Sequence, residues 1–212
     1  MNLTLKFSDL YDDEQFCDGQ EIDLRDIPET NSYCSPQARE AVLSRILPYP
    51  LCGIHWIDSG DYHYASDIFI GRIQEPFCLA LLDNHSDAQD GAFADGMLSC
   101  GNWVKVAREN NPMLIEDVWN TPVLTSSPQI PVYVSIDLDV LSPEFARTNW
   151  NQGEMSLAGM EEMISRIAAA RRVLGIDICG GLTVAKGAGP ADIGINLQTR
   201  RALAAFLGRL PE

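Results

Sequence analysis

The sequence predicts an α/β fold of three layers, in which a mainly parallel central sheet lies between two layers of helices. Short, evenly apolar runs alternate with longer amphipathic stretches along the chain. The runs are too short and too continuously apolar for half-exposed helices, and they are typical of buried parallel strands. Polar residues that can bind ligands follow directly after two of these runs, at the strand ends where parallel sheets bind ligands. We expect residues 1–212 to form a single domain.

Five apolar runs are the expected strands: residues 3–7, 52–57, 77–82, 132–136 and 173–178. Helices are expected at residues 35–46, 65–73, 100–109, 156–170 and 198–207. Ser35 and Ser156 are placed to cap their helices, and Pro36 suits the first helical position. The stretch 9–30 is the least regular part. The glycine-rich segment 180–190 lacks the spacing of a phosphate-binding loop, so we interpret it as a loop over the strand ends.

Composition and charge exclude several classes of partner. The formal charge of −15, from 30 acidic and 15 basic residues, repels nucleic acid and anionic lipid surfaces. The N-terminus reads as neither a signal peptide nor an anchor, and the longest apolar run is too short to span a bilayer. Six singly spaced cysteines, without a CxxC pair, favour a reducing cytoplasmic location. We expect none of these cysteines to compete as a metal ligand.

Two clusters of metal-binding residue types follow apolar runs. Asp83, His85 and Asp87 come directly after the run 77–82, and Asp137 and Asp139 come after the run 132–136. On a chain that stays extended, residues spaced by two point to the same side. If the two strands are neighbours, five potential ligands meet in one small volume.

Carboxylates packed this closely cannot all stay ionised unless cations neutralise their charge. Two divalent metal ions would do so, and ligation rich in carboxylates favours Mn²⁺ over structural zinc, which prefers thiolates. The alternative is that the acidic residues cap following helices and that His85 is an ordinary buried histidine. The recurrence of the pattern after two strands favours the metal site.

The same residues resemble the signatures of a known family. Asp83-Asn84-His85-Ser86-Asp87 and Ser135-Ile136-Asp137-Leu138-Asp139 look like the DxHxD and SxDxD motifs of the arginase or ureohydrolase family, which includes arginase, agmatinase and formimidoylglutamase. Segments 152–157 and 174–178 resemble the regions that follow these motifs in the family. His63, within Ser59-Gly60-Asp61-Tyr62-His63, resembles the histidine of an upstream GGDHS-like motif and is the sixth expected ligand.

The resemblance implies an arginase/deacetylase-like fold and a pair of Mn²⁺ ions. One ion would be held by His63, Asp83, Asp87 and Asp137, and the other by Asp83, His85, Asp137 and Asp139, so that Asp83 and Asp137 bridge. The metal pair would lower the pKa of a water, and Asp87, the expected catalytic residue, would orient the hydroxide toward a trigonal carbon. The implied reaction is hydrolysis of a C–N bond in a small molecule. A homo-oligomer is a further expectation from the family.

The substrate side departs from that family. Segment 99–103 has no histidine where arginases carry one, and Asp177-Ile178-Cys179-Gly180 has no glutamate to bind a guanidinium. The expected substrate is therefore a guanidino, amidino or related compound other than arginine. Asn102, Glu154 and Asp177 are the candidate substrate-binding residues, with Trp150 beside them. Two alternatives stay open: a metal-binding pseudoenzyme, and a deacetylase-type amidohydrolase, which the absence of a histidine pair disfavours.

Overall fold

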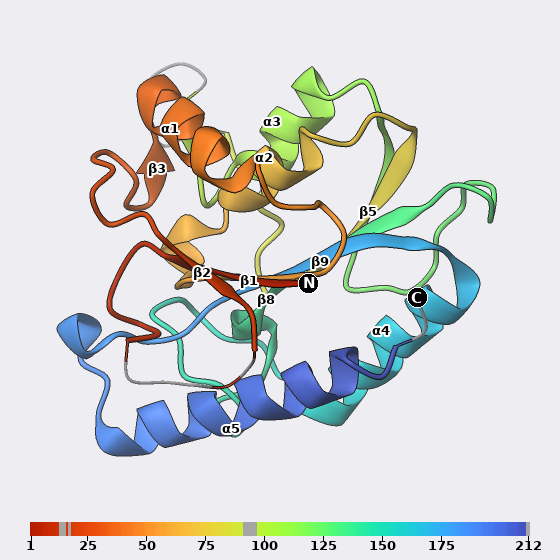
Figure 1. Ribbon diagram of the computed structural model, residues 1–212. Coiled ribbons are helices and arrows are strands. Elements are labelled where there is room, and N and C mark those ends of the chain that lie inside the picture. The colour runs from red at the N-terminus through yellow and green to blue at the C-terminus, as the bar shows by residue number, and fades with distance from the viewer. Residues whose placement is uncertain (13–15, 17, 91–96, 211–212) are drawn as a thin grey trace.

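The computed structural model describes residues 1–12, 16, 18–90 and 97–210, and its centre is a seven-stranded sheet (Figure 1). The strand order is β2-β1-β4-β9-β8-β5-β7, and every neighbouring pair is parallel. The strands are β1 (Asn2–Lys6), β2 (Gln20–Asp23), β4 (Ile54–Ile57), β5 (Phe77–Leu82), β7 (Leu114–Trp119), β8 (Val132–Asp137) and β9 (Val173–Cys179). A separate antiparallel pair is formed by β3 (Tyr33–Cys34) and β6 (Leu98–Ser99).

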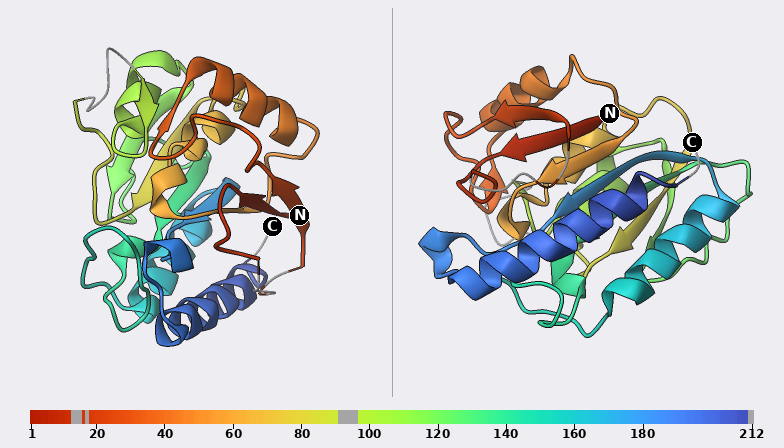
Figure 2. Two further views of the ribbon diagram at one scale, coloured as in Figure 1. Left: turned by 90° about the vertical axis from the view of Figure 1, so that its left-hand side faces the viewer. Right: turned by 60° about the horizontal axis from the view of Figure 1, so that its bottom comes forward.

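Helices cover both faces of the sheet (Figure 1, Figure 2). On one face, α1 (Pro36–Ile46), α2 (Ala65–Ile70) and α3 (Trp103–Asn110) pack on a core that includes Leu79 and Tyr133. On the other face, α4 (Leu157–Ala170) and α5 (Pro190–Leu207) pack on a core that includes Val134 and Ile178. Successive residues along β8 and along β9 thus point to opposite faces of the sheet and enter different cores, as the two-residue period of a strand requires. The predicted three-layer α/β/α fold is confirmed.

The expected helix caps are present. Ser35 Oγ accepts a hydrogen bond from the amide of Ala38, and Ser156 Oγ accepts one from the amide of Gly159. Each bond satisfies one of the amides that the first turn of a helix leaves unpaired, and such caps contribute about 1 kcal/mol. The polar residues before these two helices therefore fix where each helix begins.

Several elements differ from the prediction, among them the short strands β3 and β6, which were not predicted. The edge strands β2 and β7 were not predicted, because most of their residues are at least partly exposed and lack a continuous apolar run. Helix α2 ends at Ile70 rather than at residue 73. Helix α5 begins at Pro190 rather than at residue 198, so part of the expected loop is helical. Pro190 at the first helical position and Asp192, whose carboxylate accepts from the amide of Gly189, were the available signals.

The chain leaves β4 for β5, and β9 and β8 later fill the gap between them. The carboxyl ends of these four neighbouring strands therefore meet at one edge of the sheet, where α/β proteins bind ligands. Short 3₁₀ turns follow two of the strands: η1 (Gly60–Tyr62) after β4 and η2 (Leu138–Val140) after β8. Among the described residues, no helix is long and apolar enough to cross a membrane.

Candidate metal centre

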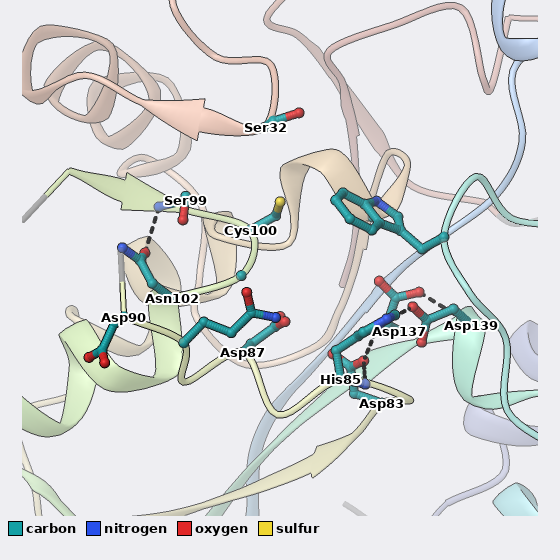
Figure 3. Close-up of a pocket in the computed structure, with 14 residues that line it drawn as sticks. Ser32, Asp83, His85, Asp87, Asp90, Ser99, Cys100, Asn102, Asp137 and Asp139 are labelled. Atoms are coloured by element: carbon teal, nitrogen blue, oxygen red, sulfur yellow. Dashed lines mark hydrogen bonds and ion pairs between the residues drawn. The ribbon is translucent and has the colours of Figure 1, made fainter. Parts of the chain in front are cut away.

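The six expected metal ligands lie together at the carboxyl ends of β4, β5 and β8. His63 follows η1, the segment after β5 supplies Asp83, His85 and Asp87, and Asp137 ends β8 while Asp139 lies in η2. β5 and β8 are hydrogen-bonded neighbours, as the prediction required. Figure 3 shows five of the six side chains turned toward the same cavity.

Two groups of ligand atoms share one carboxylate. His63 Nδ1 lies 3.2 Å from Asp83 Oδ2 and 2.9 Å from Asp87 Oδ2. His85 Nδ1 lies 3.6 Å from Asp83 Oδ1 and 2.8 Å from Asp139 Oδ2. The two oxygens of Asp83 thus face different imidazoles, which is the arrangement expected of a bridging ligand.

The ligands converge because the chain bends after each strand, and not because it stays extended as we predicted. The segment after β5 bends at residues 84, 85 and 87, and Asp87 adopts a left-handed conformation with φ of 46°. Aspartate is among the few residues that tolerate this conformation at modest cost. Asp139 lies in a 3₁₀ turn, and its own amide donates to Asp137 Oδ1 at 2.9 Å.

Hydrogen bonds behind His63 set its tautomer. The Ser135 hydroxyl donates to Asp177 Oδ1 at 2.6 Å, so Ser135 Oγ is free to accept from His63 Nε2, which lies 2.9 Å away. With the proton on Nε2, the lone pair of Nδ1 faces the acidic cluster. Metal-binding histidines are held in this way, with the second ring nitrogen donating to an outer partner.

The cluster contains buried polar atoms without a hydrogen-bond partner. Among the described residues, His63 Nδ1 and Asp83 Oδ2 have no hydrogen-bond partner, although each residue is only 1% exposed. Leaving such atoms unsatisfied costs about 1–3 kcal/mol each. A cation between them would satisfy both, so the residues present fit a divalent metal.

The electrostatics of the cluster agree with this fit. Burial and the charges of Asp137 and Asp83 raise the pKa of Asp139 to about 10. Burial and the charge of Asp83 raise the pKa of Asp137 to about 6. Without cations Asp139 holds a proton at neutral pH, and metal binding would replace that proton.

A cavity of about 310 Å³ opens above the cluster. Its floor includes Asp83, Asp87 and Asp139, and its described lining residues include no lysine or arginine (Figure 3). The remaining lining residues are Ser32, Gly60, His85, Gln89, Asp90, Ser99, Cys100, Gly101, Asn102, Asp137 and Trp150. A small molecule fits this volume, and the acidic floor disfavours an anion.

The expected substrate-binding residues divide into two groups. Asn102 and Trp150 line the cavity, although both amide atoms of Asn102 are bonded to the backbone of Ser99 and Met97. Glu154 is exposed and lies outside the cavity wall. Asp177 also does not line the cavity: it is fully buried behind His63, where it accepts a hydrogen bond from the Ser135 hydroxyl. Asp177 therefore supports the centre from behind.

Three nearby residues escaped the sequence analysis. Trp103 Nε1 donates to Asp87 Oδ2 at 2.7 Å, and Gln89 lines the cavity. Cys179 Sγ lies 3.1 Å from Asp137 Oδ2, and it could hold a metal together with Asp137 and His63. The expectation that no cysteine is placed to compete as a ligand is therefore corrected in position only: Cys179 lies among the candidate ligands. Cys179 was overlooked because only the pairing of β9 with β8 places it opposite Asp137.

Comparisons of the sequence give one relative of unknown role. No family model matches the sequence. The chain is 30% identical over 155 residues to an uncharacterized protein of Thermotoga maritima. This match covers 65% of the chain and 61% of that protein, so the chain spans about three fifths of the length of the curated relative it matches.

Comparisons of the structure are more informative. A hypothetical agmatinase from Burkholderia thailandensis superposes with a TM-score of 0.59 at 16% identity, covering 80% of this chain and 64% of that one. Proclavaminate amidino hydrolase from Streptomyces clavuligerus gives 0.57 at 17% identity, with coverage of 92% and 78%. A triple mutant of a T. brucei arginase-like protein bound with Mn²⁺ gives 0.60 at 14% identity, with coverage of 100% and 90%.

The chain has the arginase fold. At these levels of identity the comparison establishes the fold, while the reaction has to be argued from the site.

Proposed function

We propose that this chain is a hydrolase that uses two divalent metal ions to cleave a C–N bond in a small guanidino or amidino compound. The observation that carries the proposal is a pair of ligand groups at the floor of the cavity that share Asp83. One group is His63, Asp83 and Asp87, and the other is Asp83, His85 and Asp139. Mn²⁺ is the expected ion, because carboxylates dominate the predicted ligands and a structural neighbour binds Mn²⁺.

The residues of the chain have definable roles in such a reaction. Divalent ions at a centre of this kind supply Lewis acidity and lower the pKa of a water. Asp87 Oδ2, held by the indole of Trp103, lies at the cavity floor and is the group that orients the attacking water and accepts a proton. Burial raises the pKa of Asp87, which suits a proton acceptor.

The cavity wall favours a neutral or cationic substrate. Asp90 is an acidic lining residue, and Trp150 contributes an aromatic ring that packs edge-on to His85 at 6.0 Å. An aromatic face can bind a planar cation, and the described lining residues include no lysine or arginine to pair with a carboxylate. Guanidino and amidino groups meet these conditions.

Arginine itself is a poor candidate because of the backbone at Gly180. This residue occupies the place of the guanidinium-binding glutamate, and its φ is 105°. A Cβ there would lie 2.7 Å from Asp137 Oδ1, closer than real Cβ atoms approach. The structure thus has no room for that glutamate, and substrate recognition must use other residues of the wall.

A non-catalytic metal-binding protein is the second candidate. His55 stacks on Phe69 in the core, and His63 and His85 belong to the metal cluster, so the chain has no histidine outside that cluster to assist proton transfer from the cavity wall. Burial raises the pKa of the Cys100 thiol to about 12, which makes it a poor proton carrier at neutral pH. The same shortage of histidines counts against a deacetylase that requires a histidine pair.

Metal content and turnover measured together separate these candidates. Wild type, Asp83→Asn and the control Glu154→Gln would be loaded with Mn²⁺, freed of excess metal and subjected to elemental analysis. Each protein would then be assayed for release of urea or ammonia from guanidino, amidino and carboxamide compounds. Asp83→Asn removes the shared ligand at nearly constant volume, whereas Glu154 is exposed and outside the cavity.

We expect about two Mn²⁺ per chain in wild type and in Glu154→Gln, with turnover of at least one compound, and loss of both in Asp83→Asn. Wild type that binds no metal would refute the proposal, as would an Asp83→Asn variant that turns over at the wild-type rate. Two bound ions without turnover across the panel would instead support the non-catalytic candidate.

A further inference from the structure

The last residue of β9 brings a sulfur atom to the metal centre. β9 lies between β4 and β8, and Cys179 is the register partner of Asp137. After Cys179 the chain turns through Gly180, whose amide donates to the carbonyl of Asp58 at 3.0 Å. Cys179 is 0% exposed, so its thiol is held beneath the cluster and away from solvent.

The contacts of Cys179 are those of a potential ligand. Its Sγ lies 3.1 Å from Asp137 Oδ2, and ligand atoms of His63, Asp137 and Cys179 all lie within 4.8 Å of one another. A second observation points to an ion at the same place. The buried His63 Nδ1, whose lone pair faces this group, has no hydrogen-bond partner among the described residues.

We propose that Cys179 is a thiolate ligand of the metal ion that His63 and Asp137 hold. The proposal rests on the metal centre of the proposed function. On ligation the S–H bond breaks, a sulfur–metal bond forms and the proton leaves to solvent, with no change of oxidation state. A divalent ion is a strong enough local charge to deprotonate a coordinating thiol.

A thiolate changes the metal preference expected of the site. Carboxylates are hard ligands that suit Mn²⁺, whereas a thiolate is soft and favours zinc, cobalt or ferrous iron. The two positions of this centre therefore differ: the position of His63, Asp137 and Cys179 favours a softer ion than the position of Asp83, His85 and Asp139. A mixed pair of ions is the consequence for the loaded protein.

The competing interpretation is that the thiol only donates a hydrogen bond to Asp137 and fills the core, as most buried cysteines do. Cobalt distinguishes the two, because only a cobalt–thiolate bond gives an intense sulfur-to-cobalt charge-transfer band in the near ultraviolet. This readout does not depend on turnover. The amount of bound Co²⁺ would be measured in the same samples.

The test uses the full chain loaded with Co²⁺, as wild type and as Cys179→Ser, Cys179→Ala, Cys100→Ser and Cys78→Ser. Serine preserves the size of the side chain and a hydrogen bond to Asp137, and alanine serves as a second replacement if serine fails to fold. Cys100 lines the cavity and is the rival source of a band. Cys78 lies beside Ser126 in the core beneath α4 and α5, away from the metal cluster, and is the matched control.

We expect the band in wild type, Cys100→Ser and Cys78→Ser, and its loss in both Cys179 variants while visible Co²⁺ bands remain. Zn²⁺ affinity should fall in Cys179→Ser by at least the roughly 10- to 100-fold typical of a lost supporting contact, with Mn²⁺ affinity changed much less. Bound Co²⁺ without the band, or a band lost only in Cys100→Ser, would overturn the assignment of Cys179 and leave the metal centre intact. Failure of wild type to bind Co²⁺, Zn²⁺ or Mn²⁺ would overturn both proposals.

Discussion

Replacing Gly180 with alanine should reduce stability by more than its backbone angle alone explains. The φ of Gly180 is 105°, and an added Cβ would lie 2.7 Å from Asp137 Oδ1 and 2.9 Å from Leu138 Cβ. Gly187 provides a matched control, because its φ is 99° and a Cβ there would meet nothing within 4 Å. The two substitutions impose a similar backbone strain, and only one of them also crowds a metal ligand.

The expected magnitudes follow from these two terms. A non-glycine residue in a left-handed conformation costs about 1–2 kcal/mol, and overpacking a well-packed site costs about 1–3 kcal/mol. Gly187→Ala should therefore lower the free energy of unfolding by about 1–2 kcal/mol, and Gly180→Ala by about 2–5 kcal/mol. The difference between the variants isolates the contact with Asp137 and Leu138.

Urea unfolding of the metal-free proteins measures the stability term, and titration with Mn²⁺ measures the effect on the ligand. Gly180→Ala should bind Mn²⁺ more weakly than wild type, because Asp137 must move, whereas Gly187→Ala should bind Mn²⁺ normally. Equal losses of stability in the two variants, or unchanged Mn²⁺ affinity in Gly180→Ala, would refute the reasoning. Unchanged Mn²⁺ affinity in Gly180→Ala would also remove the argument that position 180 has no room for the family's glutamate.

Three further predictions concern the groups around the centre. Ser135→Ala removes the acceptor that holds His63 Nε2, so metal affinity measured by chelator competition should fall about 10- to 100-fold; an unchanged affinity would contradict the tautomer assignment. Trp103→Phe keeps an aromatic ring but removes the donor to Asp87, so turnover should fall by a similar factor of about 10–100 while metal content is preserved. The third prediction concerns pH: the pKa of Asp139 is raised to about 10, so the metal-free fold binds more protons than the unfolded chain, and its stability should fall as pH rises from about 4 to 10. Metal loading should remove much of that dependence, and urea unfolding at several pH values measures both.

The sequence predicted the interior of the fold better than its edges. β5 and β8 are buried along their whole length, and a continuous apolar run is enough to identify such strands. β7 lies at the edge of the sheet and consists of partly buried and exposed residues, so burial there does not select for an apolar pattern. Helix α5 was shortened in the prediction although Pro190 suits its first position, and packing against the sheet offsets the low helix propensity of Gly194.

The clustering of the candidate metal ligands could be predicted because five of them are metal-binding residue types close to the ends of β5 and β8, and the family resemblance added His63. The details of the site could not be, because they depend on contacts between strands. Asp177 looked like a pocket residue by its position near the end of an expected strand, but the register of β9 against β8 turns it to Ser135. Cys179 has no local signature of a ligand, and its proximity to Asp137 follows from the same register.

Both of these residues lie on one face of β9, and this explains how the strand acts on the centre. Asp177 and Cys179 are separated by two positions, so their side chains point the same way. Asp177 fixes His63 through Ser135, and Cys179 contacts Asp137 directly, so β9 acts on a ligand from each of its two neighbours, β4 and β8. The turn at Gly180 that ends this strand leaves no space for a side chain. We therefore expect variation on this face of β9 to alter metal choice before it alters substrate choice, because substrate contacts must come from the cavity wall around Trp150.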